Sequence, residues 1–106
     1  MFTIIGPLDI QRLAARIERL QQVSTHDWRG GDDLEFKNLL PGGRDRRALP
    51  DPKVLRAMTD SPSMSDWHLW ITMASRMEGL IHQNDPRNPR NMMRAMAQGR
   101  IPGRGR

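Results

Sequence analysis

The chain has 106 residues, a length that suits one domain with a single core. Its 17 basic and 12 acidic side chains give a net charge of +5, and 15 of the basic residues are arginine. Cysteine is absent, which excludes disulfides, thiolate metal sites and cysteine nucleophiles.

The hydropathy of the chain gives no sign of a membrane protein. No apolar run approaches the roughly 20 residues that span a bilayer. The start of the chain, MFTIIGPLD, lacks the basic region of a signal peptide. We therefore expect a cytoplasmic or assembly-associated protein that is not secreted by a signal peptide and does not bind membranes.

The positive charge is concentrated at the C-terminal end. Residues 1–50 hold eight basic and seven acidic side chains, whereas residues 86–106 hold six arginines and no acid. Arginine suits forked contacts to phosphate or carboxylate groups, which lysine makes only as a point charge. The basic character of the chain therefore lies in its C-terminal region.

The chain begins with an apolar stretch, residues 1–6, that ends at Gly6-Pro7. One isolated strand has no ladder to join, so this stretch is expected to be an extended arm. A helix is predicted over about 8–23, with Pro7 near its first turn. Its apolar residues are spaced by three, four and three, which predicts a seam that faces the core or a partner helix. The seam consists of Ile10, Leu13, Ile17 and Leu20.

Three arginines share the opposite side of this helix: Arg12, Arg16 and Arg19. Positions spaced by three and four residues cluster on one helical face. A solvated helix face is the ordinary interpretation of such a stripe. A contact with a polyanion is the alternative, which makes these three arginines candidate polyanion-binding residues.

Residues 24–50 are the least regular part of the sequence. A short helix is predicted near 33–40, with Asp32 as its cap and Pro41-Gly42-Gly43 as its end. Its packing residues are expected to be Leu34, Leu39 and Leu40.

A second short helix is predicted at about 52–59. Asp51 is its expected N-cap and Pro52 occupies the first helical position. Its inward side chains are expected to be Val54, Leu55 and Met58.

The longest periodic run predicts a central helix over about 66–83, with Ser65, or else Ser63 or Asp66, as its cap. Its apolar arc covers roughly 200° of the circumference, so it should have neighbours on two sides. Trp67 and Trp70 lie in that arc and are expected to be buried. The remaining polar strip comprises His68, Thr72, Ser75, Arg76, Gly79 and His82.

A last main helix is predicted over about 89–98, capped by Asn88 and started by Pro89. Little of the domain remains to cover its apolar face, and methionine adapts well to irregular partner surfaces. This face is therefore a candidate partner-binding site, with burial in the core of the chain as the alternative. The candidate residues are Met92, Met93 and Met96, with Arg90 and Arg94 beside them.

The final segment, residues 99–106 with the sequence GRIPGRGR, cannot fold on its own. Arginines spaced among glycines are typical of flexible arms that follow a phosphate backbone. Arg100, Arg104 and Arg106 are therefore candidate polyanion-binding residues in a basic tail that is flexible or ordered by a partner.

Residues for catalysis or metal binding are few. His68 and His82 are 14 residues apart, about 21 Å along a helix, and cannot share one metal. Glu78 and His82 have a suitable spacing for two ligands but lack a third. The segment with His26 and Asp27 matches no known spacing, and nucleotide-binding and serine-nucleophile signatures are missing. We predict no catalytic residue, no metal and no cofactor, and interpret the chain as a non-enzyme.

These observations predict an all-α protein with one domain over 1–98 and a tail over 99–106. The expected function is that of a non-enzymatic assembly or adaptor protein, a small component of a larger virion-like or ribonucleoprotein-like complex with a protein partner. A nucleic-acid-binding regulator or packaging protein is the alternative. An inhibitor that caps a host protein surface is a further alternative, and a homo-oligomer is also consistent with the sequence.

Overall fold

The computed structural model describes residues 5–23, 30–85 and 87–97 of the chain. Within these ranges the protein is helical and contains no strand, which confirms the predicted all-α class. Five helices follow one another: α1 (Pro7–Gln21), α2 (Gly30–Leu39), α3 (Pro52–Arg56), α4 (Met64–Asn84) and α5 (Pro89–Ala97).

Helix α1 follows the sequence prediction closely. The Asp9 carboxylate accepts a hydrogen bond from the Gly6 backbone N–H at 3.1 Å, and Pro7 occupies the first turn, so the start of the helix is well satisfied. The predicted apolar seam is buried along its whole length, together with Ala14. The helix ends at Gln21, two residues before the predicted end. Of the predicted N-terminal arm, residues 1–4 lie outside the described residues, and Ile5 is buried.

Helix α2 packs through Leu39 and Leu40, as expected, but also through Phe36, which was not expected. It begins at Gly30, so Asp32 lies inside the helix and is not its cap. Phe36 and Leu39 are buried, whereas Leu34 is 62% exposed, so the prediction for Leu34 was wrong. Positions 34 and 36 lie about 200° apart around a helix, and the side of α2 that meets the core is the side of Phe36.

Helix α3 is shorter than predicted and ends at Arg56. Asp51 caps it as expected, because its side chain accepts from the Lys53 backbone N–H at 2.8 Å. Leu55 is fully buried and Met58 packs partly buried against the core. Val54 is 59% exposed, which corrects the prediction that it points inward. This helix of five residues buries two side chains, Pro52 and Leu55.

Helix α4 is the central helix of the body. Ser63, and not Ser65, is its N-cap, and its hydroxyl accepts from the Asp66 N–H at 3.1 Å. Its buried side chains are Met73, Ala74 and Met77. Trp67 and Trp70 are only partly buried, which corrects their predicted place in the interior. They lie in the first two turns of α4 and pack against the edge of the core.

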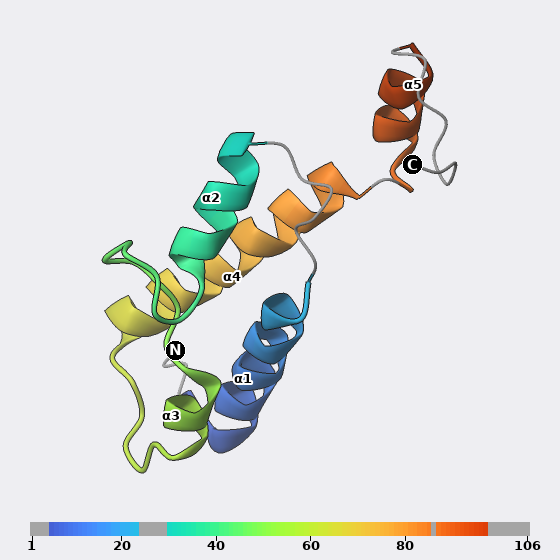
Figure 1. Cartoon of the computed structure of the whole chain (residues 1–106). Coiled ribbons are helices and arrows are strands. Elements are labelled where there is room, and N and C mark those ends of the chain that lie inside the picture. Colours follow the sequence, from blue (N-terminus) through green and yellow to red (C-terminus); the bar gives the residue numbers. More distant parts are fainter. Residues whose placement is uncertain (1–4, 24–29, 86, 98–106) are drawn as a thin grey trace.

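Two helices of the body pack against α4, in line with the prediction that it has neighbours on two sides. Helix α4 contacts α1 on one side and α2 on the other, while α3 packs against α1 (Figure 1). Its narrow polar strip is exposed, as predicted. The core is formed where α1, α2, α3 and α4 meet.

An arginine–glutamate ion pair borders each of these three helix contacts. Arg16 of α1 makes a forked pair with Glu78 of α4, at 2.7 and 2.9 Å, and also donates to the Ser75 hydroxyl. Arg56 of α3 makes a forked pair with Glu18 of α1, with both distances 2.6 Å. The third pair joins Arg76 of α4 to Glu35 of α2.

The α1–α4 pair predicts a stability loss in acid. The hydrogen bonds from Arg16 lower the pKa of Glu78, so the folded chain favours the charged carboxylate. Its stabilisation is present above the unfolded-state pKa, near 4.3, and is lost as the pH falls through the lower folded-state value. Urea unfolding at pH 6 and pH 3 should show a smaller acid loss for Glu78→Gln than for the wild type, by less than about 1 kcal/mol because both groups are partly solvated. Equal losses would contradict this assignment.

Candidate protein-docking surface

Helix α5 lies beyond the C-terminal end of α4, away from the body of the protein (Figure 1). None of its described side chains belongs to the core or to the partly buried set around it. The described chain has a radius of gyration of 16.7 Å, whereas a compact domain of this length is expected near 13 Å. The projecting helix accounts for an elongated molecule.

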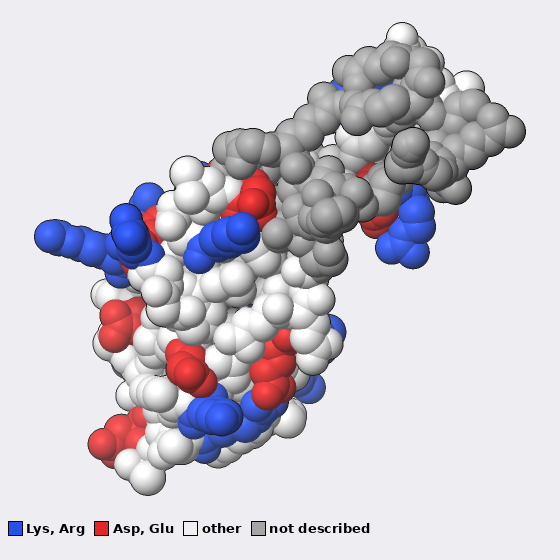
Figure 2. All heavy atoms as spheres, viewed as in Figure 1, with Lys and Arg blue, Asp and Glu red and all other residues white. Residues whose placement is uncertain are grey.

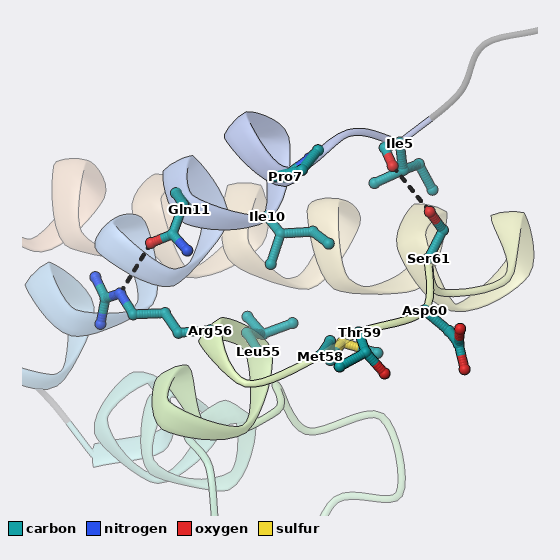
Figure 3. Close-up of a pocket in the computed structure, with 10 residues that line it drawn as sticks. All are labelled: Ile5, Pro7, Ile10, Gln11, Leu55, Arg56, Met58, Thr59, Asp60 and Ser61. Atoms are coloured by element: carbon teal, nitrogen blue, oxygen red, sulfur yellow. Dashed lines mark hydrogen bonds between the residues drawn. The ribbon is translucent and has the colours of Figure 1, made fainter.

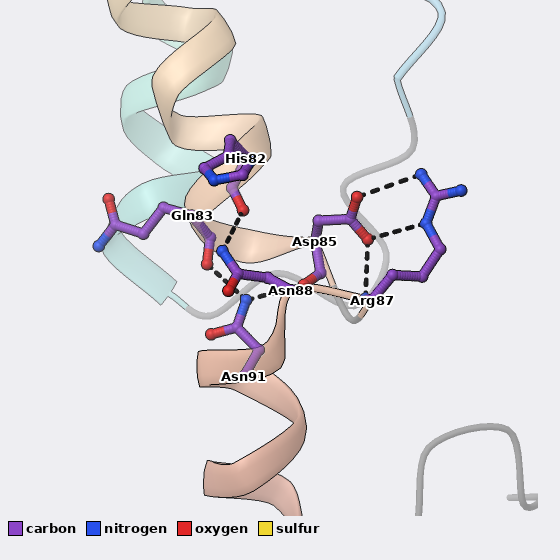
Figure 4. Close-up of polar contacts among 6 residues, drawn as sticks. All are labelled: His82, Gln83, Asp85, Arg87, Asn88 and Asn91. Atoms are coloured by element: carbon purple, nitrogen blue, oxygen red, sulfur yellow. Dashed lines mark hydrogen bonds and ion pairs between the residues drawn. The ribbon is translucent and has the colours of Figure 1, made fainter.

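Polar contacts, and not apolar packing, join α5 to α4. We call this junction the asparagine elbow, defined by Asn88 and Asn91 and the end of α4 (Figure 4). The Asn88 side chain donates to the His82 carbonyl at 3.0 Å. The Asn91 side chain donates to the carbonyls of Gln83 and Asp85, at 2.5 and 2.8 Å. The last carbonyls of a helix lack hydrogen-bond donors within it. Here the side chains of Asn88 and Asn91 act as those donors.

The elbow also fixes the start of α5. The side-chain oxygen of Asn88 accepts a hydrogen bond from the Arg90 backbone N–H at 3.0 Å. Asn88 is therefore the N-cap of α5, as predicted. The Asp85 carboxylate accepts from the Arg87 backbone and guanidinium, and the latter contact in particular lowers the pKa of Asp85. Because the Asn91 side chain bonds carbonyls at the end of α4, the side of α5 that carries Asn91 faces α4.

The methionine face of α5, defined as Met92, Met93 and Met96, is open to solvent. These side chains are 40%, 72% and 67% exposed. At about 100° per residue they cover an arc of roughly 100° that does not include Asn91. Because the elbow turns Asn91 toward α4, the methionine face points away from the junction.

Arg90 and Arg94 lie outside the methionine face, about 60° and 100° around the helix from Met93, its nearest member. They are four residues apart, hence about 40° apart around the helix and neighbours along it. Both are exposed, and the described residues provide no ion pair to either of them. All five residues that the sequence singled out for partner binding lie on α5, but Arg94 is on the side of Asn91 and not on that of the methionines.

The arginines proposed for polyanion binding do not form one site. Arg100, Arg104 and Arg106 lie outside the described residues. Arg16 is not free for a polyanion contact, because its guanidinium pairs with Glu78 and its side chain is only 24% exposed. Arg12 and Arg19 remain exposed, about 10 Å apart along α1. Basic groups lie beside acidic ones over most of the visible body, so this face shows no single-sign field (Figure 2).

A shallow pocket of about 140 Å³ lies where the N-terminal segment, α1 and α3 meet (Figure 3). Ile5, Ile10 and Leu55 give it an apolar floor, and Gln11 and Arg56 lie on its edge. Small-molecule sites usually measure roughly 300 Å³ or more. The Arg56 guanidinium is already bound to Glu18 and Gln11. The pocket therefore suits ordered water better than a ligand.

The residues considered for chemistry are not brought together. Glu78 is engaged by Arg16 and is not a metal partner for His82. Among the described residues, no three histidine, aspartate or glutamate side chains gather as metal ligands would. His26 and Asp27 lie outside the described residues.

The asparagine elbow was not found from the sequence. Its signal was present in NDPRNPRN, where four asparagine or aspartate residues surround two prolines. Such residues bind nearby backbone groups readily, but which carbonyls they bind depends on how the two helices meet.

No helix in the described part of the chain combines the length and apolar character that crossing a membrane requires. Comparison with protein-family models, curated proteins and solved structures finds no match to this chain.

Proposed function

We propose that this protein is a non-enzymatic assembly or adaptor protein that docks onto a partner protein through α5. The observation that carries this proposal is the exposure of the methionine face on a helix outside the core. Because these three methionines are exposed to water, they add little to the free energy of folding. An exposed apolar patch of this kind on a soluble domain is typical of an interaction surface.

The asparagine elbow supports the same function. Hydrogen bonds at both ends of the α4–α5 junction position α5 before any partner arrives. A helix held in its binding orientation loses less conformational freedom on docking than a flexible segment. Methionine side chains can then adapt to the shape of the partner.

The test uses the full chain with all three methionines of the face changed to glutamine. Glutamine keeps the length and helix propensity of methionine but removes its apolar character. The protein is isolated from its native source at 50 and 200 mM salt, and co-purifying molecules are identified by mass spectrometry and by nuclease treatment. We expect a protein partner to be retained by the wild type at both salt concentrations and reduced at least tenfold with the triple variant.

Met64→Gln is the matched control, because Met64 is also exposed, at 44%, but lies at the far end of α4. It should retain the partner fully. Circular dichroism should give the same helicity and Tm for all three proteins, since the methionine face contributes nothing to the core. Retention of the partner by the triple variant would refute docking through α5. Retention that is nuclease-sensitive and falls steeply with salt would instead favour the nucleic-acid-binding alternative.

A further inference from the structure

The methionines of the described chain divide into a buried and an exposed group. Met73 and Met77 of α4 are 4% and 0% exposed and belong to the core. Of the described methionines, those exposed by 40% or more are Met64 and the three members of the methionine face. The exposed methionine side chains of the described residues are thus concentrated on one side of α5.

Sulfur chemistry distinguishes these side chains from other apolar residues. Peroxides oxidise the methionine thioether to a sulfoxide, and methionine sulfoxide reductases reverse the change. The chain has no cysteine, so it offers no thiol that would react with peroxide in place of methionine. Because the oxidant must reach the sulfur, oxidation is expected to follow the exposure of each methionine.

We infer that Met92, Met93 and Met96 are sites of reversible sulfoxidation by peroxides, and that this modification prevents α5 from docking. The inference rests on the proposed function and adds a regulation of the same site. A sulfur lone pair attacks one peroxide oxygen, so an S–O bond forms as the O–O bond breaks. The other oxygen leaves as hydroxide and takes the proton of the transferred oxygen to give water. Sulfur loses two electrons and the peroxide gains them.

The sulfoxide removes the property that makes the face suitable for docking. Its oxygen is a hydrogen-bond acceptor, and an acceptor buried in an apolar contact without a donor opposes association. The three methionines lie on one arc of about 100°, so a contact with the face includes more than one of them. One sulfoxide is therefore expected to weaken docking, and further oxidation to abolish it.

The fold is insulated from this modification. No described side chain of α5 belongs to the core, and the asparagine elbow holds α5 through amide groups and backbone carbonyls that peroxide does not change. A sulfoxide at Met77 would instead place a polar oxygen among fully buried apolar side chains. Oxidation confined to the methionine face therefore changes docking while the body stays folded.

The same exposure makes the change reversible. A sulfoxide reductase needs access to the modified side chain, and the methionine face is open to solvent. In the return reaction the sulfoxide oxygen leaves as water, while two thiols of the reducing system form a disulfide. The sulfur regains the two electrons, and the apolar face is restored.

The experiment sorts oxidised molecules by their ability to dock. The full chain is partially oxidised with hydrogen peroxide, and catalase then removes the oxidant. The mixture is passed over the immobilised partner protein that the wild type retains in the test of the proposed function. Peptide mass spectrometry measures the sulfoxide at each methionine in the bound and unbound fractions. We expect sulfoxide at the methionine face to be enriched roughly tenfold in the unbound fraction.

Met64 is the matched control within the same molecules, because it is also exposed but lies at the opposite end of α4. Its sulfoxide should form readily and be distributed equally between the two fractions. Met73 and Met77 should stay unoxidised, and the Tm should not change. Treating the unbound fraction with the methionine sulfoxide reductases A and B should return it to the bound fraction.

An equal distribution of sulfoxide at the methionine face would overturn the inference. So would oxidation of Met73 and Met77 at the rate of Met93, a fall in Tm, or failure of the reductases to restore binding. The outcomes also separate the two proposals. If oxidised chains bind while the triple glutamine variant does not, docking through α5 stands and regulation by oxidation fails. If the triple glutamine variant keeps the partner, or if no partner protein is isolated, the proposed function itself fails.

Discussion

Phe36→Ala should lower the free energy of unfolding by about 3 to 5 kcal/mol, which is the cost of removing a large aromatic side chain from a packed core. Phe36 is 1% exposed and is among the largest fully buried side chains of the described chain. It belongs to the core cluster, on the side of α2 that meets the body, so its loss leaves a cavity in the core. Domains of this size are stable by about 5 to 15 kcal/mol in total. Urea unfolding followed by circular dichroism measures the change.

Leu34→Ala provides the control on the same helix. Leu34 is two residues away and 62% exposed. Its replacement should change the free energy of unfolding by less than about 0.5 kcal/mol, as is usual for surface positions. Comparable losses from the two variants would mean that α2 does not meet the body through the side that carries Phe36.

Gly43→Ala should destabilise the protein by roughly 3 kcal/mol, at the upper end of the usual cost of forcing atoms into a filled space. A Cβ at position 43 would lie 2.7 Å from the carbonyl carbon of Asn38 and 2.9 Å from the carbonyl oxygen of Lys37. Both are backbone atoms of the last turn of α2, so no side chain can rotate away. The loop after α2 returns over that turn, and the Leu49 N–H bonds the Leu39 carbonyl at 2.9 Å. Thermal unfolding should show a lower Tm.

Gly42→Ala is the matched comparison one residue earlier. Gly42 has φ +87°, which disfavours a side chain, but no atom lies within 4 Å of its would-be Cβ. The expected cost is about 1 to 2 kcal/mol, from backbone conformation alone. If Gly42→Ala destabilises the protein more than Gly43→Ala, the close approach of the loop to α2 is not the constraint that we describe.

The proposed function places docking on one short stretch of the chain. The asparagine elbow joins α5 to the end of α4 and leaves its methionine face exposed. The body contributes a long base, because α4 is 21 residues long and contacts both α1 and α2. The proposed docking helix is therefore separate from the folding core.

The sequence by itself determined the features that depend on local order. The seam of α1 and the polar strip of α4 follow from a spacing of 3.6 residues per turn, which a helix obeys wherever it sits. The caps at Asp51 and Asn88 follow from side chains that reach backbone groups two residues away. The grouping of Met92, Met93 and Met96 on one side of α5 follows from the same spacing, but their exposure does not, because the sequence left burial in the core open.

Only the tertiary structure decided which neighbours each side chain meets. Residues 34 and 36, like residues 54 and 55, are all apolar, and in helices this short the periodicity does not say which of them points inward. Arg16 looked like part of a basic stripe until the fold brought Glu78, 62 residues away, within hydrogen-bonding distance. The tryptophans of α4 looked like core because they are large and apolar, but the packed helices leave them only partly buried. Such contacts arise from the placement of separate helices, and a pattern read within one helix cannot contain them.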